Sequence, residues 1–171
     1  MNTTAVAPTS DITDPKQQAR VRRVLRKGAF AVLSTVSPAG RPHAAGVVYD
    51  TAPGEDALYV HTMRSSRKAR NIAENAHVGV VVSVKRVPMA PPYTVQFQGF
   101  AELIDMDDRR IVGLLAAGHL STVSGHGALD EPDGVFVRIT PDRRVHTYGI
   151  GVSTLALARD PLHVGARTVE L

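Results

Sequence analysis

The residues of this 171-residue chain best suited to chemistry lie in one short run, residues 62–71, which reads T-M-R-S-S-R-K-A-R-N. The run places four cations and two serine hydroxyls where a predicted strand meets a predicted helix. A helix that begins near Ser66 aims its unpaired N–H groups and the positive end of its dipole into this corner. Ser65 and Ser66 add hydroxyl donors, and Arg67 and Lys68 add full charges. The combination is typical of a phosphate or carboxylate cradle.

The same run also has a purely structural interpretation, in which Ser66 caps the helix and the cations cover a solvated face. A Walker loop is excluded, because its glycines and its fixed lysine spacing are absent. The seven histidines are scattered and form no H-x-x-H or H-E-x-x-H pair, so we predict no metal site. The absence of cysteine excludes disulfides, thiolate ligands and cysteine nucleophiles.

Basic side chains are concentrated in the first half of the chain. Residues 15–73 hold eleven of them against three acids, a net charge of +8, whereas the whole chain carries +4. Such a segment suits a phosphate, a nucleic acid or plain solvation. A nucleic-acid role has little support, because the recognised binding motifs are absent and only 5% of the residues are aromatic.

Composition places the chain among globular proteins of one domain, with 43% apolar and 21% charged residues. No apolar run approaches the length of a membrane span. Residues 1–10 show neither a basic nor an apolar leader region, so we expect a cytoplasmic protein with no membrane association.

The elements that must position the basic corner follow from local periodicity and turn residues. Residues 15–27 form an amphipathic helix that begins after Asp14 and has a basic outer face. Two further helices are expected at 66–75 and from 106 onward, with a glycine-rich connection at 118–134. Alternation and turn signals predict six strands, at 29–36, 41–50, 57–62, 77–86, 93–105 and 135–148. Short strands joined by tight turns favour a small closed barrel over a doubly wound sheet.

The order of these segments resembles that of a known family. The segments are 31–50 (A-V-L-S-T-V-S-P-A-G-R-P-H-A-A-G-V-V-Y-D), 58–82, 96–103 (Q-F-Q-G-F-A-E-L) and 135–149. Together they resemble the pyridoxamine 5′-phosphate oxidase-like superfamily, the flavin and deazaflavin split-barrel group, over roughly residues 20–150. The resemblance implies a mainly β fold, a six-stranded antiparallel split β-barrel with small helices. It also implies a homodimer with the cofactor at the subunit interface.

On this basis we expect a flexible N-terminal arm at 1–13 and a cofactor-binding split barrel at 14–150. Residues 151–171 are expected to be an extension that packs on the barrel or on the dimer partner. Residue by residue, the resemblance carries the family's cofactor-phosphate segment onto Thr62, Ser66, Arg67 and Lys68. It carries the ring-lining strand onto Val47, Val48 and Tyr49, and a position that reaches the ring onto Thr94. Arg70 and Asn71 fall in R-N-I, which resembles the K-x-R-N-L stretch of the deazaflavin branch.

The chain departs from true pyridoxamine phosphate oxidases at three points. Ala45 and Asp50 stand where those enzymes have an arginine and a lysine, and the chain contains no tryptophan for their C-terminal substrate segment. An acid at position 50 repels a substrate phosphate. We therefore do not expect oxidation of vitamin B6.

The implied function is hydride transfer between a bound FMN or coenzyme F(420) and a small organic substrate. The R-N-I match and the basic first helix, which could meet the acidic tail of F(420), favour F(420). The chemistry belongs to the cofactor, and no catalytic side chain is assigned, although Tyr49, His61 and Tyr148 could exchange protons. The alternative is a non-catalytic split barrel that stores or senses its cofactor, or that binds haem.

Overall fold

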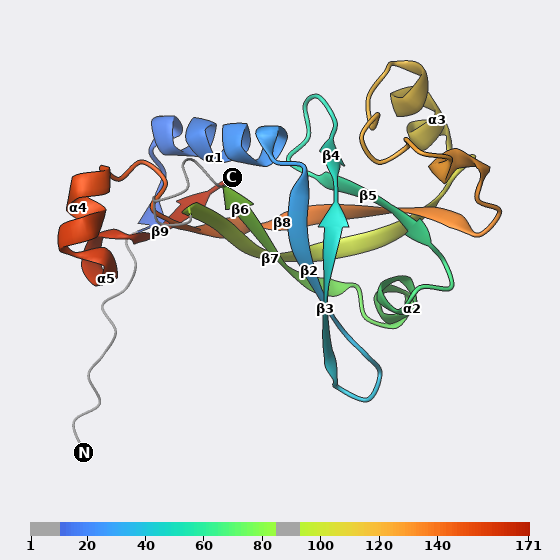
Figure 1. The fold of residues 1–171 in the computed structure, drawn as a ribbon, viewed down its shortest axis with the longest axis horizontal. Coiled ribbons are helices and arrows are strands. Elements are labelled where there is room, and N and C mark those ends of the chain that lie inside the picture. The colour runs from blue at the N-terminus through green and yellow to red at the C-terminus, as the bar shows by residue number, and fades with distance from the viewer. Residues whose placement is uncertain (1–10, 85–92) are drawn as a thin grey trace.

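The computed structural model describes residues 11–84 and 93–171. Within these ranges nine strands form one strongly curved sheet, flanked by helices (Figure 1). The longer strands are β2 (Phe30–Val36), β3 (Pro42–Val48), β5 (Leu58–Met63), β6 (His77–Val84), β7 (Tyr93–Asp105) and β8 (Gly134–Tyr148). These are the six strands predicted from the sequence, and the described part of each lies within a few residues of its expected bounds. Positions 85–86 of the fourth prediction lie outside the described residues.

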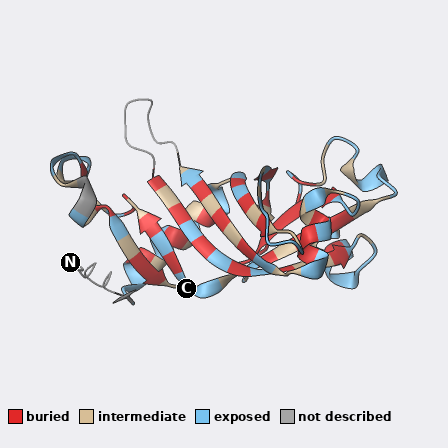
Figure 2. Ribbon diagram, turned by 90° about the horizontal axis from the view of Figure 1, so that it is seen from below, coloured by how far each residue is buried: buried red, intermediate tan, exposed pale blue. Residues whose placement is uncertain are grey.

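The strands alternate between the inside and the outside of the curve, as Figure 2 shows along their length. In β2, Ala31 and Leu33 are buried while Phe30 and Val32 are exposed. Period-two burial is what a sheet with one covered face imposes. The inner residues form one apolar core, which includes Leu33, Val60, Val80, Val95, Val137 and Val145.

The sheet runs in the order β3, β2, β6, β7, β8 and β5, with every neighbouring pair antiparallel. The long strand β8 pairs with β7 along one side. Along its other side, its first half pairs with β5 and its second half with a later strand. The register shifts between Phe97 and Gly99, opposite Pro141, where the sequence predicts a bend. No ladder joins β3 to β5 in the described part of the chain. The barrel is therefore split, and not closed as periodicity alone suggested.

Helix α1 (Pro15–Lys27) and helix α2 (Arg67–Glu74) pack at different places on this sheet. The Asp14 carboxylate accepts a hydrogen bond from the Lys16 amide and starts α1, whose buried Val21 and Leu25 cover one end of the core. Helix α2 packs against β2 and β7 near the other end. The two basic helices lie well apart in Figure 1.

The C-terminal segment is more ordered than its weak periodicity indicated. It forms α4 (Thr154–Arg159), α5 (Pro161–Val164) and β9 (Ala166–Glu170), which pairs with β8. Strand β1 (Asp11–Ile12), which falls in the predicted arm, pairs in parallel with β9. The predicted strand at 135–148 is therefore the last long strand, and the short β9, which the sequence did not predict, follows it. Residues 1–10 of the predicted arm lie outside the described residues.

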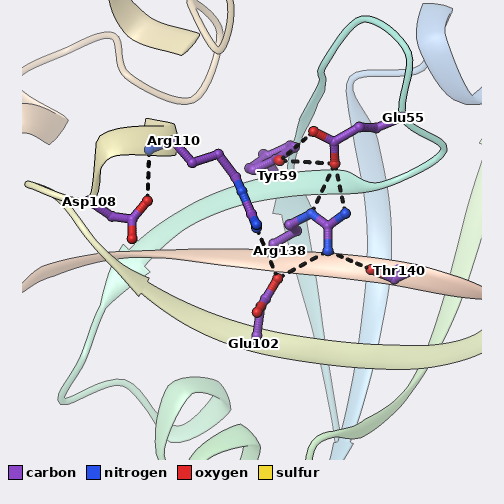
Figure 3. A network of polar contacts seen from close by, with 7 residues as sticks. All are labelled: Glu55, Tyr59, Glu102, Asp108, Arg110, Arg138 and Thr140. Carbon is purple, nitrogen blue, oxygen red and sulfur yellow. Dashed lines mark hydrogen bonds and ion pairs between the residues drawn. The ribbon is translucent and has the colours of Figure 1, made fainter. Parts of the chain in front are cut away.

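A second, smaller apolar cluster covers the outer face of β5, β7 and β8. Helix α3 (Arg109–Ala116) and the 118–134 connection, which contains a short 3-10 helix at Ala128–Asp130, pack here over Tyr59 and Phe136. Strand β4 (Asp50–Thr51) pairs with β5 nearby. A polar network borders the cluster, in which Arg138 bonds the carboxylates of Glu55 and Glu102 (Figure 3).

Candidate functional site

The basic corner forms where β5 ends and α2 begins, as the sequence predicts. Ser66 is the N-cap of α2, with extended backbone, and its Oγ accepts a hydrogen bond from the Ala69 amide at 3.3 Å. The Thr62 hydroxyl donates to the same Oγ at 3.3 Å. Thr62 is buried and fixes the cap from the strand side. The remaining amides of the first turn thus point out of a braced helix end.

Two residues of the predicted cradle are already engaged by acids. The amide of Ser65 donates to the Asp133 carboxylate at 2.9 Å, and Arg64 forms an ion pair with Asp105. Bonds from the amide and hydroxyl of Ser65 hold the pKa of Asp133 below its usual range. Asp105 lies at the end of β7 and Asp133 just before β8. Through these two acids, Arg64 and Ser65 hold the loop between β5 and α2 in place. This narrows the predicted cluster of four cations to three.

The three remaining cations lie on α2 itself. Arg67 and Arg70 are exposed and Lys68 is half-buried, and none has a carboxylate partner within residues 11–84 and 93–171. Burial lowers the pKa of the Lys68 ammonium. Arg67 and Lys68 occupy the first turn, which contains no acid, and a cation there opposes the helix dipole. A bound anion would remove this electrostatic conflict.

Asn71, predicted to contact the cofactor, faces the protein interior. Its side-chain amide donates to the Thr35 hydroxyl at 2.9 Å, and that hydroxyl reaches the His43 carbonyl at 3.4 Å. Asn71 is only 4% exposed. It fastens α2 to β2, and its role here is to position the helix.

The predicted ring-lining residues alternate across β3 and the residue after it. Val47 and Tyr49 face inward, while Val48 is 46% exposed on the outer face. The Tyr49 hydroxyl donates to the Leu25 carbonyl at 2.8 Å, under α1. Burial raises the pKa of Tyr49. A phenol this enclosed joins α1 to the sheet and is unsuited to proton transfer with a substrate.

Thr94 and α2 lie at opposite ends of β7. Thr94 pairs with Ser83 and Tyr148, whereas the chain just after α2 bonds the amide of Ala101. Seven residues of strand span roughly 20 Å. One chain alone therefore does not bring Thr94 to the basic corner.

His61 points away from the corner, into the second cluster. Its ring meets Phe136 edge-on with centroids 5.4 Å apart, and burial lowers its pKa. Its Nε2 is enclosed and has no hydrogen-bond partner among the described residues. Its strand neighbour Thr62 faces the other side of β5, so His61 does not share a site with the cradle.

Asp50 has a role that the sequence did not reveal. Its carboxylate accepts hydrogen bonds from the amides of Thr122 and Val123, at 2.8 and 3.0 Å. The acid anchors the 118–134 connection against the sheet. Partners more than seventy residues away leave no local signal, which is why the sequence indicated only a charge.

Two structural features that bear on function are absent from residues 11–84 and 93–171. No group of three or more histidines and acids within them could hold a metal ion. None of their helices is both long enough and apolar enough to cross a membrane.

Comparison with known proteins places the chain in a family context. A family model described as pyridoxamine 5′-phosphate oxidase matches residues 17–148. No curated protein matches. Among solved structures, the chain is similar to HutZ, a heme storage protein from Vibrio cholerae. The two share 17% identity at a TM-score of 0.66, covering 82% of this chain and 97% of that one.

Two further structures share the fold. A heme-binding protein from Mycobacterium smegmatis is 21% identical at a TM-score of 0.67, covering 83% of this chain and 57% of that one. An F(420) reductase is 22% identical at a TM-score of 0.50, covering 71% and 92%. Identities at this level show a common architecture, and one fold hosts several functions.

Proposed function

The chain belongs to the pyridoxamine 5′-phosphate oxidase family, and from that premise we propose that it binds a flavin-type cofactor and acts as an oxidoreductase on a small organic substrate. The observation that carries the proposal is the basic corner. Arg67 and Lys68 stand unpaired, among the described residues, in the first turn of α2, beside a cap braced by Thr62. Charge-assisted bonds from these groups suit the phosphate of a cofactor.

In this proposal the chain binds and orients, and the cofactor, when bound, supplies hydride acceptance and donation. Arg67, Lys68 and the first amides of α2 hold the phosphate, and Arg70 adds charge one turn further along. Thr62 and Asn71 position the helix without touching the ligand. Neither Tyr49 nor His61 is placed to serve as an acid or base beside the corner.

FMN and F(420) both fit a phosphate cradle, and we propose F(420) ahead of FMN. The R-N-I stretch that resembles the deazaflavin branch supports this order. The basic face of α1 gives less support to F(420) than the sequence suggested. Within one subunit, α1 lies at the opposite end of the barrel from the basic corner. It could meet an acidic cofactor tail only from a second subunit.

We propose that the active form is a homodimer built on the outer face of the sheet. Phe30, Val32, Val48 and Phe100 are between 37% and 55% exposed, and strand pairing places them on one side of β2, β3, β6 and β7. A large exposed apolar patch is typical of an interaction surface. A second copy would also bring its own Thr94 and sheet face toward the first cradle.

Light scattering coupled to size-exclusion chromatography tests the dimer. We expect twice the mass of the chain, and a monomer for Val48→Glu, which places a charge on this apolar face next to Phe30. A monomeric wild-type protein would contradict the shared cofactor site.

We do not propose that the chain oxidises vitamin B6. The chain lacks the tryptophan of the oxidases' substrate segment, and Ala45 stands where they have an arginine. Asp50, the other departure, holds a loop in place through two amides.

Titration of the purified protein with FMN and with F(420), followed by cofactor absorbance and fluorescence, tests the cofactor assignment. We expect saturable binding of one cofactor per chain, tighter for F(420). Anaerobic reduction of the bound cofactor and reoxidation by candidate acceptors then separates an enzyme from a storage protein. Failure to bind either cofactor would contradict the proposed function.

Haem binding is the second candidate, and one observation favours it. His146 lies in an open groove of about 740 Å³ on the sheet face, and its Nδ1 is within 3.1 Å of the Thr168 hydroxyl. A hydrogen bond at Nδ1 orients an imidazole whose Nε2 can bind a metal. A Soret band that appears when haem is added to wild type and is lost in His146→Ala would support this candidate. The absence of a Soret band in wild type would exclude it.

A further inference from the structure

A separate cavity of about 350 Å³ lies beside α1. It sits at the end of the barrel where β6 finishes and β7 begins, whereas α2 lies near the opposite ends of these strands. The wall of the cavity is mixed: several apolar side chains line it, together with the polar groups of the turn after β8 and two cations from one face of α1. The residues concerned are Val24, Val84, Tyr93 and Ile150 on the wall, with Arg20 and Arg23.

Arg20 is held in place by a buried amide. Gln17 is 2% exposed, and its Nε2 donates to the Ile150 carbonyl at 3.2 Å. Its Oε1 accepts from the Arg20 guanidinium at 3.1 Å. One side chain thus joins the helix to the turn after β8 and orients a cation at the cavity.

The turn comes unusually close to this amide and this cation. Gly151 has a φ of +77°, a conformation that favours glycine. A Cβ atom on it would lie 2.5 Å from Gln17 Oε1 and 2.8 Å from the Arg20 guanidinium. A side chain at 151 would strain the backbone and would displace the Gln17 amide and the Arg20 guanidinium, so glycine there suits their positions.

The charges at the cavity have no acid to balance them among residues 11–84 and 93–171. Neither Arg20 nor Arg23 has a carboxylate partner in the part of the chain that the structure describes. Residues three apart on a helix lie on one face, so both guanidiniums can serve the same ligand. A guanidinium matches the planar geometry of a carboxylate, and the apolar side chains of the wall favour a ligand with an apolar body.

We propose that this cavity binds a small organic carboxylate with an apolar body, of the size of an aromatic or short aliphatic acid. The assignment is independent of the cofactor, because the cavity uses none of the residues of the basic corner. Free inorganic phosphate would gain the contacts with the two guanidiniums but none with the apolar side chains of the wall.

Benzoate is a suitable probe, with benzamide as its neutral counterpart. We would measure binding by equilibrium dialysis, with and without FMN, and follow the Gly151 amide by two-dimensional NMR. The pocket variant is Arg20→Gln with Arg23→Gln. The control is Arg26→Gln with Lys27→Gln, on the same helix but outside the cavity lining.

We expect one benzoate per chain, with affinity about tenfold or more weaker in the pocket variant and unchanged in the control. Benzamide should bind at least about tenfold more weakly than benzoate, and the Gly151 amide signal should shift on benzoate addition. The proposal is overturned if benzoate fails to bind, if benzamide binds equally well, or if phosphate displaces benzoate at equal concentration. Equal loss in both variants would also overturn it. Circular dichroism establishes that each variant is folded.

Discussion

The two basic helices of this chain use their charges in opposite ways. Helix α1 places Arg26 and Lys27 in its last turn, where cations stabilise the dipole, and Arg22 pairs with Asp56 at 3.0 Å. Helix α2 places Arg67 and Lys68 in its first turn, where cations are unfavourable, and leaves them without acids among the described residues. The contrast supports the proposal that the first turn of α2 holds an anion, whereas Arg22 and the last-turn cations of α1 stabilise the protein itself.

Removing both cations of the α2 first turn gives the largest effect expected from this contrast. Arg67→Ala or Lys68→Ala should each weaken cofactor binding by about one to two orders of magnitude, since charge-assisted bonds contribute roughly 1.5–3 kcal/mol. The double variant should lose at least about a hundredfold. Fluorescence titration measures these affinities.

The matched control for that experiment is Arg26→Ala with Lys27→Ala on α1. Its affinity for FMN should stay within about threefold of wild type, since screened surface charges contribute little. Equal losses from the two helices would show that general charge, and not the α2 corner, attracts the cofactor. A loss in the control confined to F(420) would show that α1 meets the acidic tail.

Removing the N-terminal cap of each helix should give the next largest effect. Ser66→Ala and Asp14→Ala each remove a side-chain bond to an amide, and each should cost about 1 kcal/mol of unfolding free energy. Only Ser66→Ala should also weaken cofactor binding, because Ser66 caps α2, and the first amides of α2 face the proposed phosphate. Urea denaturation and cofactor titration of the same two variants separate the effects. If Asp14→Ala weakens binding as much, the caps act through stability alone.

Replacing one lysine in each helix should change stability in opposite directions. Without cofactor, Lys68→Met should stabilise the protein by roughly 0.3–1 kcal/mol, because a half-buried cation leaves the positive end of a dipole. Lys27→Met should destabilise it by a similar amount. Thermal unfolding should show shifts of about one to four degrees of opposite sign. A destabilised Lys68→Met protein would remove the argument that α2 carries an electrostatic conflict.

The pH dependence of Lys68 gives the smallest expected effect. Burial lowers its pKa from 10.5, so the folded protein releases this proton at a lower pH than the unfolded chain does. The penalty for burying the charge is present below the folded pKa and disappears as pH rises toward 10.5. Wild type should therefore gain stability relative to Lys68→Met between pH 7 and 10. A constant difference in urea midpoints across this range would contradict the lowered pKa.

The sequence predicted the framework of the fold because its signals are local. Alternation and turn residues located six strands, and Asp14 and Ser66 located two helix starts. The short strands β1 and β9 were missed because two and five residues are too few to show a periodic pattern. Within the site, the bonds of Ser65 to Asp133 and of Asn71 to Thr35 join positions far apart in the chain. Such pairings depend on the folded topology, so local chemistry assigned Ser65 to the cradle and the family resemblance assigned Asn71 to the cofactor.

The most direct test of the α2 corner compares each cofactor with its phosphate-free form. FMN is paired with riboflavin, and F(420) with its deazaflavin chromophore, in wild type and in the variant with Arg67→Ala and Lys68→Ala. We predict that wild type prefers the phosphorylated form by about a hundredfold and that the variant loses most of this preference. An equal preference in both proteins, or none in wild type for either pair, would contradict the assignment of the corner to a cofactor phosphate.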